Sequence, residues 1–192
     1  MINAIKYGSL QDVQAALKKV KANDILENKS DNTSLHIAAF NGEPEKLEIL
    51  LKSLNQDEKA AAINKPNKFG WTPLTDALYP IQPIEDYKKE ALKNGVPEAE
   101  IKNHEEWYYK RFENMSKTVR VLLVNGANPF PSNDANRLGE NGSEQLGLRD
   151  IVRENIKAFG ENSFEAKCVK KAEEIIIITQ HQWHLFGFAK QH

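Results

Sequence analysis

The sequence predicts an all-α fold in which about four short helix pairs stack side by side as a solenoid. Two segments open alike, Thr-Ser-Leu-His-Ile-Ala at 33–38 and Thr-Pro-Leu-Thr-Asp-Ala at 72–77. A leucine stripe follows the first segment at 47–51, and a similar apolar stretch appears much later, at 119–129. One such unit cannot bury its apolar face alone, so its repetition along 192 residues indicates a stacked array.

Each half of the unit has the sequence signals of a short helix. Thr72 can cap the first amides of a helix, and Pro73 fits the first turn because its missing amide would be unpaired there. Gly42 is expected to end the first helix of its unit, since glycine tolerates a positive φ. The buried stripe of the second, antiparallel helix is predicted to consist of Leu47, Leu50 and Leu51.

These segments resemble the ankyrin repeat, a unit of about 33 residues with a Thr-Pro-Leu-His-x-Ala signature. Segment 33–38 lacks only the proline and segment 72–77 only the histidine, while Leu-Leu-Val-Asn-Gly-Ala-Asn at 122–128 resembles the family's closing sequence. The resemblance implies that His36 ties neighbouring turns together by hydrogen bonds. It also implies a protein that binds another protein and has no cofactor and no chemistry of its own.

Departures from a regular array indicate two insertions. Thr33 and Thr72 are 39 residues apart, about six more than the period, and we assign the surplus to 55–62, as a longer second helix or exit loop. A larger insertion, residues 79–116, separates the two helices of the second clear repeat.

The larger insertion is predicted to be a projecting helical hairpin. Its first helix spans 84–94 and is followed by Gly95. Its second runs unbroken from about Pro97 to Val124, roughly 40 Å long at ~1.5 Å per residue. One helical face is kept throughout that second helix by Ile101, Tyr108, Phe112, Met115, Val119 and Leu122.

Four units are therefore predicted along the chain. They are an N-terminal capping unit at 1–30, a repeat at 31–69, the interrupted repeat at 70–130, and a degenerate C-terminal capping unit with a tail at 131–192. Within the last unit we expect a long loop at 129–143, an outer helix starting near Phe164 that closes the stack, and an aromatic tail at 181–188.

Composition excludes several other classes of protein. Twenty-six Lys and Arg against 27 Asp and Glu leave a net charge of −1, which does not favour a nucleic-acid binder. The longest aliphatic run, Ile175–Ile178, is far shorter than a membrane-spanning helix. One cysteine forbids an internal disulfide, and the first residues do not resemble a signal peptide. We expect a cytoplasmic monomer; ankyrin arrays resembling this one also occur among effectors that intracellular bacteria deliver into host cells.

Two alternative functions are weighed against partner binding. A metal-dependent or thiol enzyme would use His181 and His184, spaced i, i+3, or Cys168, whose pKa neighbouring lysines could lower. No phosphate loop or nucleophile elbow is present, and a buried Cys168 better fits its helical face. The second alternative is a regulatory or inhibitory subunit of a partner enzyme. We predict no catalytic residue and no metal.

A partner would contact the concave inner surface and the loop tips of such an array. Phe69 and Trp71 are unusual for an exposed tip, and they either form a binding hot spot or pack on adjacent tips. On the hairpin, Trp107 and Arg111 share a predicted solvent face with Lys110 and Asn114, unless Trp107 covers helix 84–94; His-Glu-Glu at 104–106 is expected to be solvated. The candidate partner-binding residues are Phe40, Asn41, Asn67, Lys68, Phe69, Trp71, Asp76, Tyr79, Trp107 and Arg111.

Overall fold

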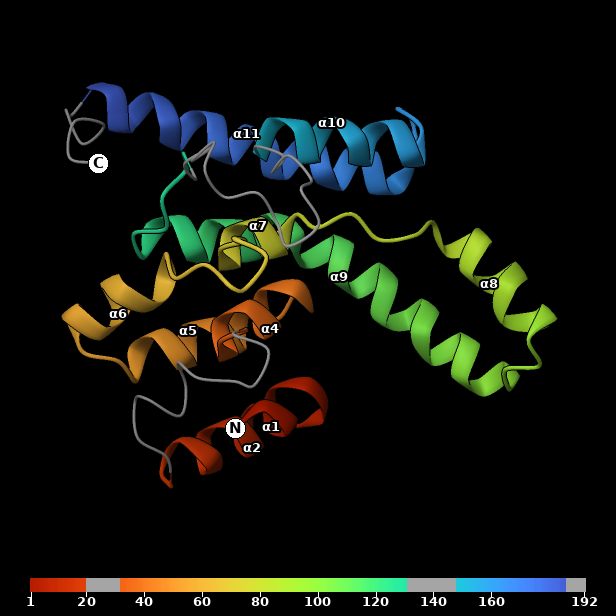
Figure 1. The fold of residues 1–192 in the computed structure, drawn as a ribbon, viewed down its shortest axis with the longest axis horizontal. Helices are drawn as coiled ribbons and strands as arrows, with labels where there is room; N and C mark the ends of the chain where they lie inside the picture. The colour runs from red at the N-terminus through yellow and green to blue at the C-terminus, as the bar shows by residue number, and fades with distance from the viewer. Residues whose placement is uncertain (20–31, 131–147, 186–192) are drawn as a thin grey trace.

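The computed structural model describes residues 1–19, 32–130 and 148–185, and within these ranges every regular element is an α-helix (Figure 1). The all-α prediction is confirmed. The predicted loop at 129–143 lies almost wholly outside the described residues, as does the end of the aromatic tail. The helices are α1 (Ile2–Tyr7), α2 (Leu10–Leu17), α4 (Ser34–Phe40), α5 (Pro44–Lys52), α6 (Gln56–Ile63), α7 (Pro73–Ala77), α8 (Ile84–Lys93), α9 (Glu98–Val124), α10 (Leu148–Phe159) and α11 (Phe164–Leu185).

The helices stack as pairs in two layers. The first helices α1, α4 and α7 lie in one layer, with α4 packed between the other two. The second helices α2 and α5 and the C-terminal part of α9 form the other layer, and α11 covers α9. In Figure 1 the pairs follow one another from α1 and α2 at the bottom to α10 and α11 at the top. The stacked helix pairs of the predicted solenoid are therefore present.

Local signals begin and end these helices as the sequence predicts. The hydroxyls of Thr33 and Thr72 accept hydrogen bonds from the amides three residues on. Gly42 follows α4 with φ +64°, a backbone conformation that favours glycine. The surplus at 55–62 is neither a longer α5 nor a loop. Asn55 caps a separate helix, α6, through a reciprocal pair of hydrogen bonds with Glu58.

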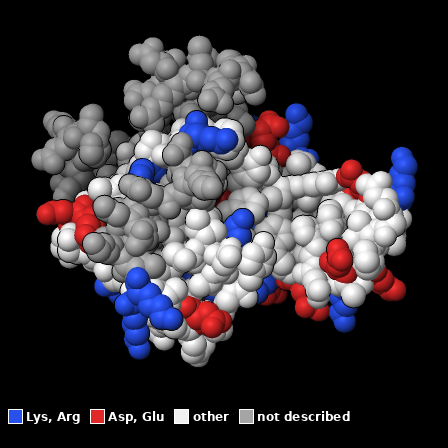
Figure 2. Space-filling view, turned by 60° about the horizontal axis from the view of Figure 1, so that its bottom comes forward, with Lys and Arg blue, Asp and Glu red and all other residues white. Residues whose placement is uncertain are grey.

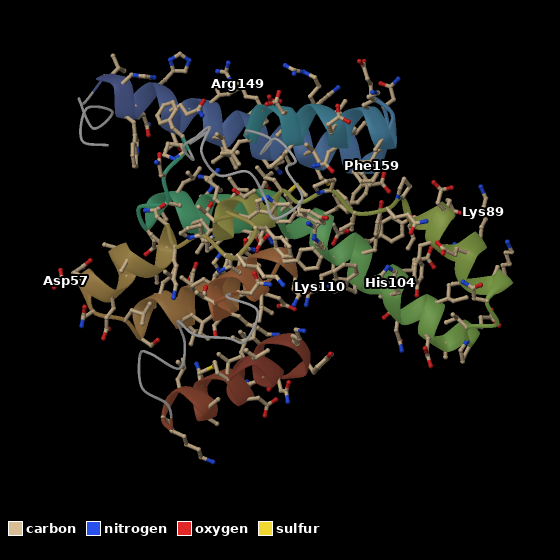
Figure 3. The ribbon with its side chains drawn as sticks, viewed as in Figure 1. Asp57, Lys89, His104, Lys110, Arg149 and Phe159 are labelled. Carbon is tan, nitrogen blue, oxygen red and sulfur yellow. The ribbon has the colours of Figure 1, made fainter. Side chains whose placement is uncertain are left out.

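Helix α9 is unbroken over 27 residues, as predicted. Its N-terminal half pairs with α8 as a hairpin that projects to the right of the stack in Figure 1, and its C-terminal half is a member of the stack. The predicted apolar stripe is buried along the whole helix, and Tyr108, Val119 and Leu122 are fully inaccessible. Phe112 also packs on Phe159, at the end of α10 (Figure 3), with ring centroids 5.3 Å apart.

Polar contacts fix the hairpin against the stack, and they correct one prediction. Arg111 does not lie on a solvent face, because it is only 1% exposed. Its Nε donates to the Phe40 carbonyl (2.6 Å) and its Nη2 to the Tyr79 carbonyl (2.8 Å). Carbonyls at the ends of α4 and α7 lack helical partners, so a buried guanidinium satisfies them. Asn114 likewise donates to the Gly42 carbonyl at 3.0 Å.

Candidate functional site: an aromatic groove

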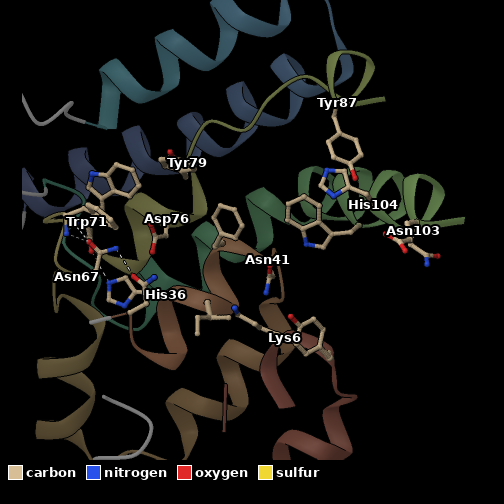
Figure 4. A pocket seen from close by; sticks show the side chains of 17 residues that line it. Lys6, His36, Asn41, Asn67, Trp71, Asp76, Tyr79, Tyr87, Asn103 and His104 are labelled. Carbon is tan, nitrogen blue, oxygen red and sulfur yellow. Dashed lines mark hydrogen bonds between the residues drawn. The ribbon is translucent and has the colours of Figure 1, made fainter. Parts of the chain in front are cut away.

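A groove of about 890 Å³ lies between the first helices of the stack and the α8–α9 hairpin (Figure 4). The stack contributes side chains from α1, α4, α7 and the turn before α7, and the hairpin contributes the opposite wall. Eight of the ten candidate residues line this groove. They are Phe40, Asn41, Asn67, Phe69, Trp71, Asp76, Tyr79 and Trp107.

Seven rings follow one another along the groove, and we call them the aromatic row. Each ring centroid lies 3.8–6.1 Å from the next, so the rings are in contact from one end of the groove to the other. In order, the aromatic row consists of Phe69, Trp71, Tyr79, Phe40, Trp107, His104 and Tyr87.

The loop tip that carries Phe69 and Trp71 is held by the side chain of Asn67. The Asn67 Oδ1 accepts hydrogen bonds from the amides of Phe69 (2.9 Å) and Trp71 (3.0 Å), and its Nδ2 donates to Asn32 Oδ1 (2.8 Å). Asn67 is buried, and these three hydrogen bonds fix the conformation of the loop tip. Lys68 lies outside the groove lining, with its ammonium 5.0 Å from the centre of the Phe69 ring.

His36 joins two neighbouring repeats, as the resemblance implied. Its Nδ1 accepts a hydrogen bond from the Thr33 amide (3.0 Å), which leaves Nε2 as the donor to the Trp71 carbonyl (2.9 Å). Burial lowers the pKa of His36 to about 4, so the ring is neutral at physiological pH. The imidazole therefore fixes the backbone at Trp71.

Asp76 is the one buried acidic side chain among the described groove residues, and it is only 6% exposed. Its side chain points into the groove between His36 and Tyr79 (Figure 4). Burial raises the pKa of Asp76 to about 7, and the positive charge of Arg111 offsets that rise only in part. No ion pair joins the two side chains within 4.0 Å in the described part of the chain.

The hairpin wall of the groove contains residues, such as His104 and Tyr87, that are not among the candidate partner-binding residues predicted from the sequence. His104 stacks on Tyr87 with ring centroids 3.8 Å apart, and burial lowers the pKa of His104. The predicted solvated face at 104–106 is therefore wrong for His104, and Glu105 makes a contact to Lys88 at 3.1 Å. His104 precedes Trp107 by three residues, so their shared helical face was the signal for this wall. Trp107 contacts Phe40 as well as His104, and lies between the stack and the hairpin.

The residues considered for chemistry do not form a site in the described structure. His181 and His184 are both exposed on α11, and no group of three His, Cys, Asp or Glu suited to a metal occurs among the described residues. Burial, with help from Glu165 and Glu113, raises the pKa of Cys168, whereas the sequence analysis considered a lowered value. A raised thiol pKa disfavours a nucleophile.

Neither sign of charge dominates the face of the molecule that Figure 2 shows. Figure 2 shows positive and negative side chains interspersed on one face, and the described residues there form no patch of a single sign. Among the described helices, none combines the length and the apolar character needed to cross a membrane.

Comparison with known families identifies the first part of the chain. Residues 1–82 match the family model of ankyrin repeats, in three copies. The matched region covers α1 to α7, and it ends where the hairpin interrupts the third helix pair. Residues 1–82 therefore belong to the ankyrin-repeat family, and such repeats indicate a protein–protein interaction module. No curated protein and no solved structure matches the chain significantly.

Proposed function

We propose that this chain binds a partner protein in the groove between the stack and the hairpin. The aromatic row carries the proposal, because large amphipathic rings dominate the energy of protein interfaces. A plain repeat array offers its concave face and its loop tips, whereas here the hairpin adds a second wall. Trp107, His104 and Tyr87 belong to that wall, so the insertion determines which partner fits.

The groove is held ready in the free protein. Arg111 and Asn114 bond the hairpin to backbone carbonyls of the stack, and Asn67 bonds the loop tip into one shape. A preformed site loses less conformational entropy on binding than a flexible one. The resemblance extends this proposal to a monomeric protein in the cytoplasm that acts on a host partner, as bacterial effectors of this kind do.

Site-specific photo-crosslinking tests where a partner binds. We expect benzoylphenylalanine at Tyr87 or Asn103, both in the groove lining, to give discrete crosslinked products in cell extract. The same reagent at Asp57 on α6 or at Lys89 on α8 (Figure 3) should give none of these products, because both exposed residues lie outside the groove.

The variant Trp107→Ala supplies the second arm of this experiment. Removing the ring that joins the stack and hairpin parts of the aromatic row should reduce the products from Asn103 about tenfold, because a hot-spot residue contributes on the order of 1–2 kcal/mol. An unchanged far-ultraviolet circular dichroism spectrum shows that the variant is folded. Equal labelling from groove and control positions, or labelling that survives Trp107→Ala, would overturn the proposal.

A further inference from the structure

The Asp76 carboxylate has no partner within residues 1–19, 32–130 and 148–185, where neither a hydrogen bond nor an ion pair engages it. Buried carboxylates in proteins are nearly always paired, because burial removes the water that would otherwise solvate the charge. Asp76 is 94% buried and points into an open groove (Figure 4). An unpaired group in this position indicates that its partner comes from another molecule.

The surroundings of Asp76 favour a cation as that partner. Tyr79 follows Asp76 by three residues, just beyond the end of α7, and its ring is 4.5 Å from the Trp71 ring and 6.1 Å from the Phe40 ring. Aromatic faces carry partial negative charge and attract Lys and Arg side chains. A carboxylate flanked by such rings attracts a positive group and repels an acidic one.

Arg111 fills this role only in part, because its guanidinium lies 5.0 Å from the centre of the Phe40 ring but forms no ion pair with Asp76 among the described residues. Its Nε and Nη2 donate to the Phe40 and Tyr79 carbonyls, whereas its Nη1 is buried without a hydrogen-bond partner in the described residues and does not come within 4.0 Å of the carboxylate oxygens. The pKa of Asp76 stays near 7 despite Arg111, so burial outweighs the attraction between the two. The carboxylate therefore has a positive charge nearby but no cation in contact with it among the described residues.

We propose that the groove receives a partner segment through a cationic side chain, Lys or Arg, placed against Asp76 between the Trp71, Tyr79 and Phe40 rings. The proposal rests on the function proposed above and names the chemistry of its partner. The side-chain amides of Asn41 and Asn103 line the same groove and make no hydrogen bond within the described residues. These two amides are therefore free to form hydrogen bonds with the backbone of an extended partner segment. Such a segment would lie along the aromatic row.

A peptide array tests this inference with the full chain. Each pool contains ten-residue peptides with one fixed central residue, and equal mixtures elsewhere. We expect the labelled protein to bind pools fixed as Lys or Arg about tenfold better than pools fixed as norleucine, which keeps the aliphatic stem and lacks the charge. Asp76→Asn should abolish this preference. Asp57→Asn, which removes an exposed carboxylate on α6, should retain it. The ranking of the Lys and Arg pools distinguishes the two cations.

The results of the peptide array and of the crosslinking experiment test the cationic partner and the use of the groove separately. Four outcomes would each overturn the proposal of a cationic partner side chain. They are equal binding of the Lys and norleucine pools, a preference that survives Asp76→Asn, strongest binding of the acidic pools, and no binding to any pool. The proposed use of the groove is judged separately by the crosslinks from Tyr87 and Asn103, which require no particular charge. Urea unfolding of Asp76→Asn confirms that the variant is folded before it is compared.

Discussion

His36 and Asp76 show that burial disfavours the charged form of both side chains, with different results. The neutral ring of His36 has both its nitrogens bonded, so its low pKa accompanies a stable link between repeats. The carboxylate of Asp76 has no such partner in the described structure, and its ionised form is destabilising. Asp76 therefore lowers the stability of the free protein at neutral pH.

Replacing Asp76 by Asn should stabilise the protein in a pH-dependent way. The pKa of Asp76 in the folded protein is about 7, above the ordinary value of 3.8. The contribution of Asp76 to the free energy of unfolding of the wild type is therefore fully present below pH 3.8, and it is lost as the pH rises through 7. Asn cannot ionise. The free energy of unfolding of Asp76→Asn relative to wild type should therefore rise between pH 4 and pH 7 by about 2–4 kcal/mol and then level off. Urea titrations at pH 4.5 and pH 8 measure it, and a pH-independent difference would contradict it.

Sequence alone predicts the role of His36 but not the state of Asp76 or Arg111. The bonds of His36 are made within one repeat and to the next, so the motif contains the information. Asp76 is buried beside Arg111, which comes from the far end of an insertion. Arg111 itself follows the polar side of the α9 pattern, yet α9 lies between α11 on one side and α4 and α7 on the other. A single-face pattern cannot show that a helix is covered on two faces.

Among the elements, α9 and the turn after α4 depend on each other. Gly42 lies against the backbone of α9, and a Cβ at this position would be 2.8 Å from the Cα of Arg111 and 2.9 Å from its carbonyl oxygen. That approach is closer than a methyl group allows. The position of the hairpin therefore depends on a residue with no side chain.

Gly42→Ala should destabilise the protein and loosen the hairpin. The positive φ and the contact with α9 together predict a loss of about 2–4 kcal/mol. Gly95→Ala is the matched control, because Gly95 has φ +71° but open space around its Cβ position, which predicts a loss of about 1 kcal/mol. Urea unfolding gives both values, and hydrogen exchange in α8 reports the hairpin. Equal losses in the two variants would show that the contact with Arg111 is unimportant.

At the scale of the whole molecule, the repeats are completed by distant segments. The third pair takes its first helix from α7 and its second from the C-terminal half of α9, with the whole hairpin between them. The resemblance of 72–77 and 122–128 to the two halves of one repeat, together with the apolar spacing along α9, predicted this arrangement. The tilt of the hairpin and the resulting groove could not be predicted, because they depend on bonds from Arg111 and Asn114 to backbone far away in sequence. The unit boundaries at residues 30, 69 and 130 remain a prediction.

A fragment limited to the matched repeats should not fold cooperatively. Residues 1–82 retain α7 but lose α9, so the fully buried Leu74 and Leu78 would lose much of their cover. We expect weak helical circular dichroism and a broad, non-cooperative urea transition from this fragment, beside a sharp transition from the full chain. A cooperative transition with a midpoint like that of the full chain would show that the first repeats are self-sufficient.

The continuity of α9 links the wall of the groove to the far side of the molecule. Over roughly 40 Å the helix is a single stiff rod, with its outer half beside the groove and its inner half pressed against α11. Arg111 and Asn114 act as the pivot near its middle. We expect a ligand that displaces the outer half of α9 to strain the packing of its inner half, so spectroscopic labels on α11 should register binding on the far side of the protein.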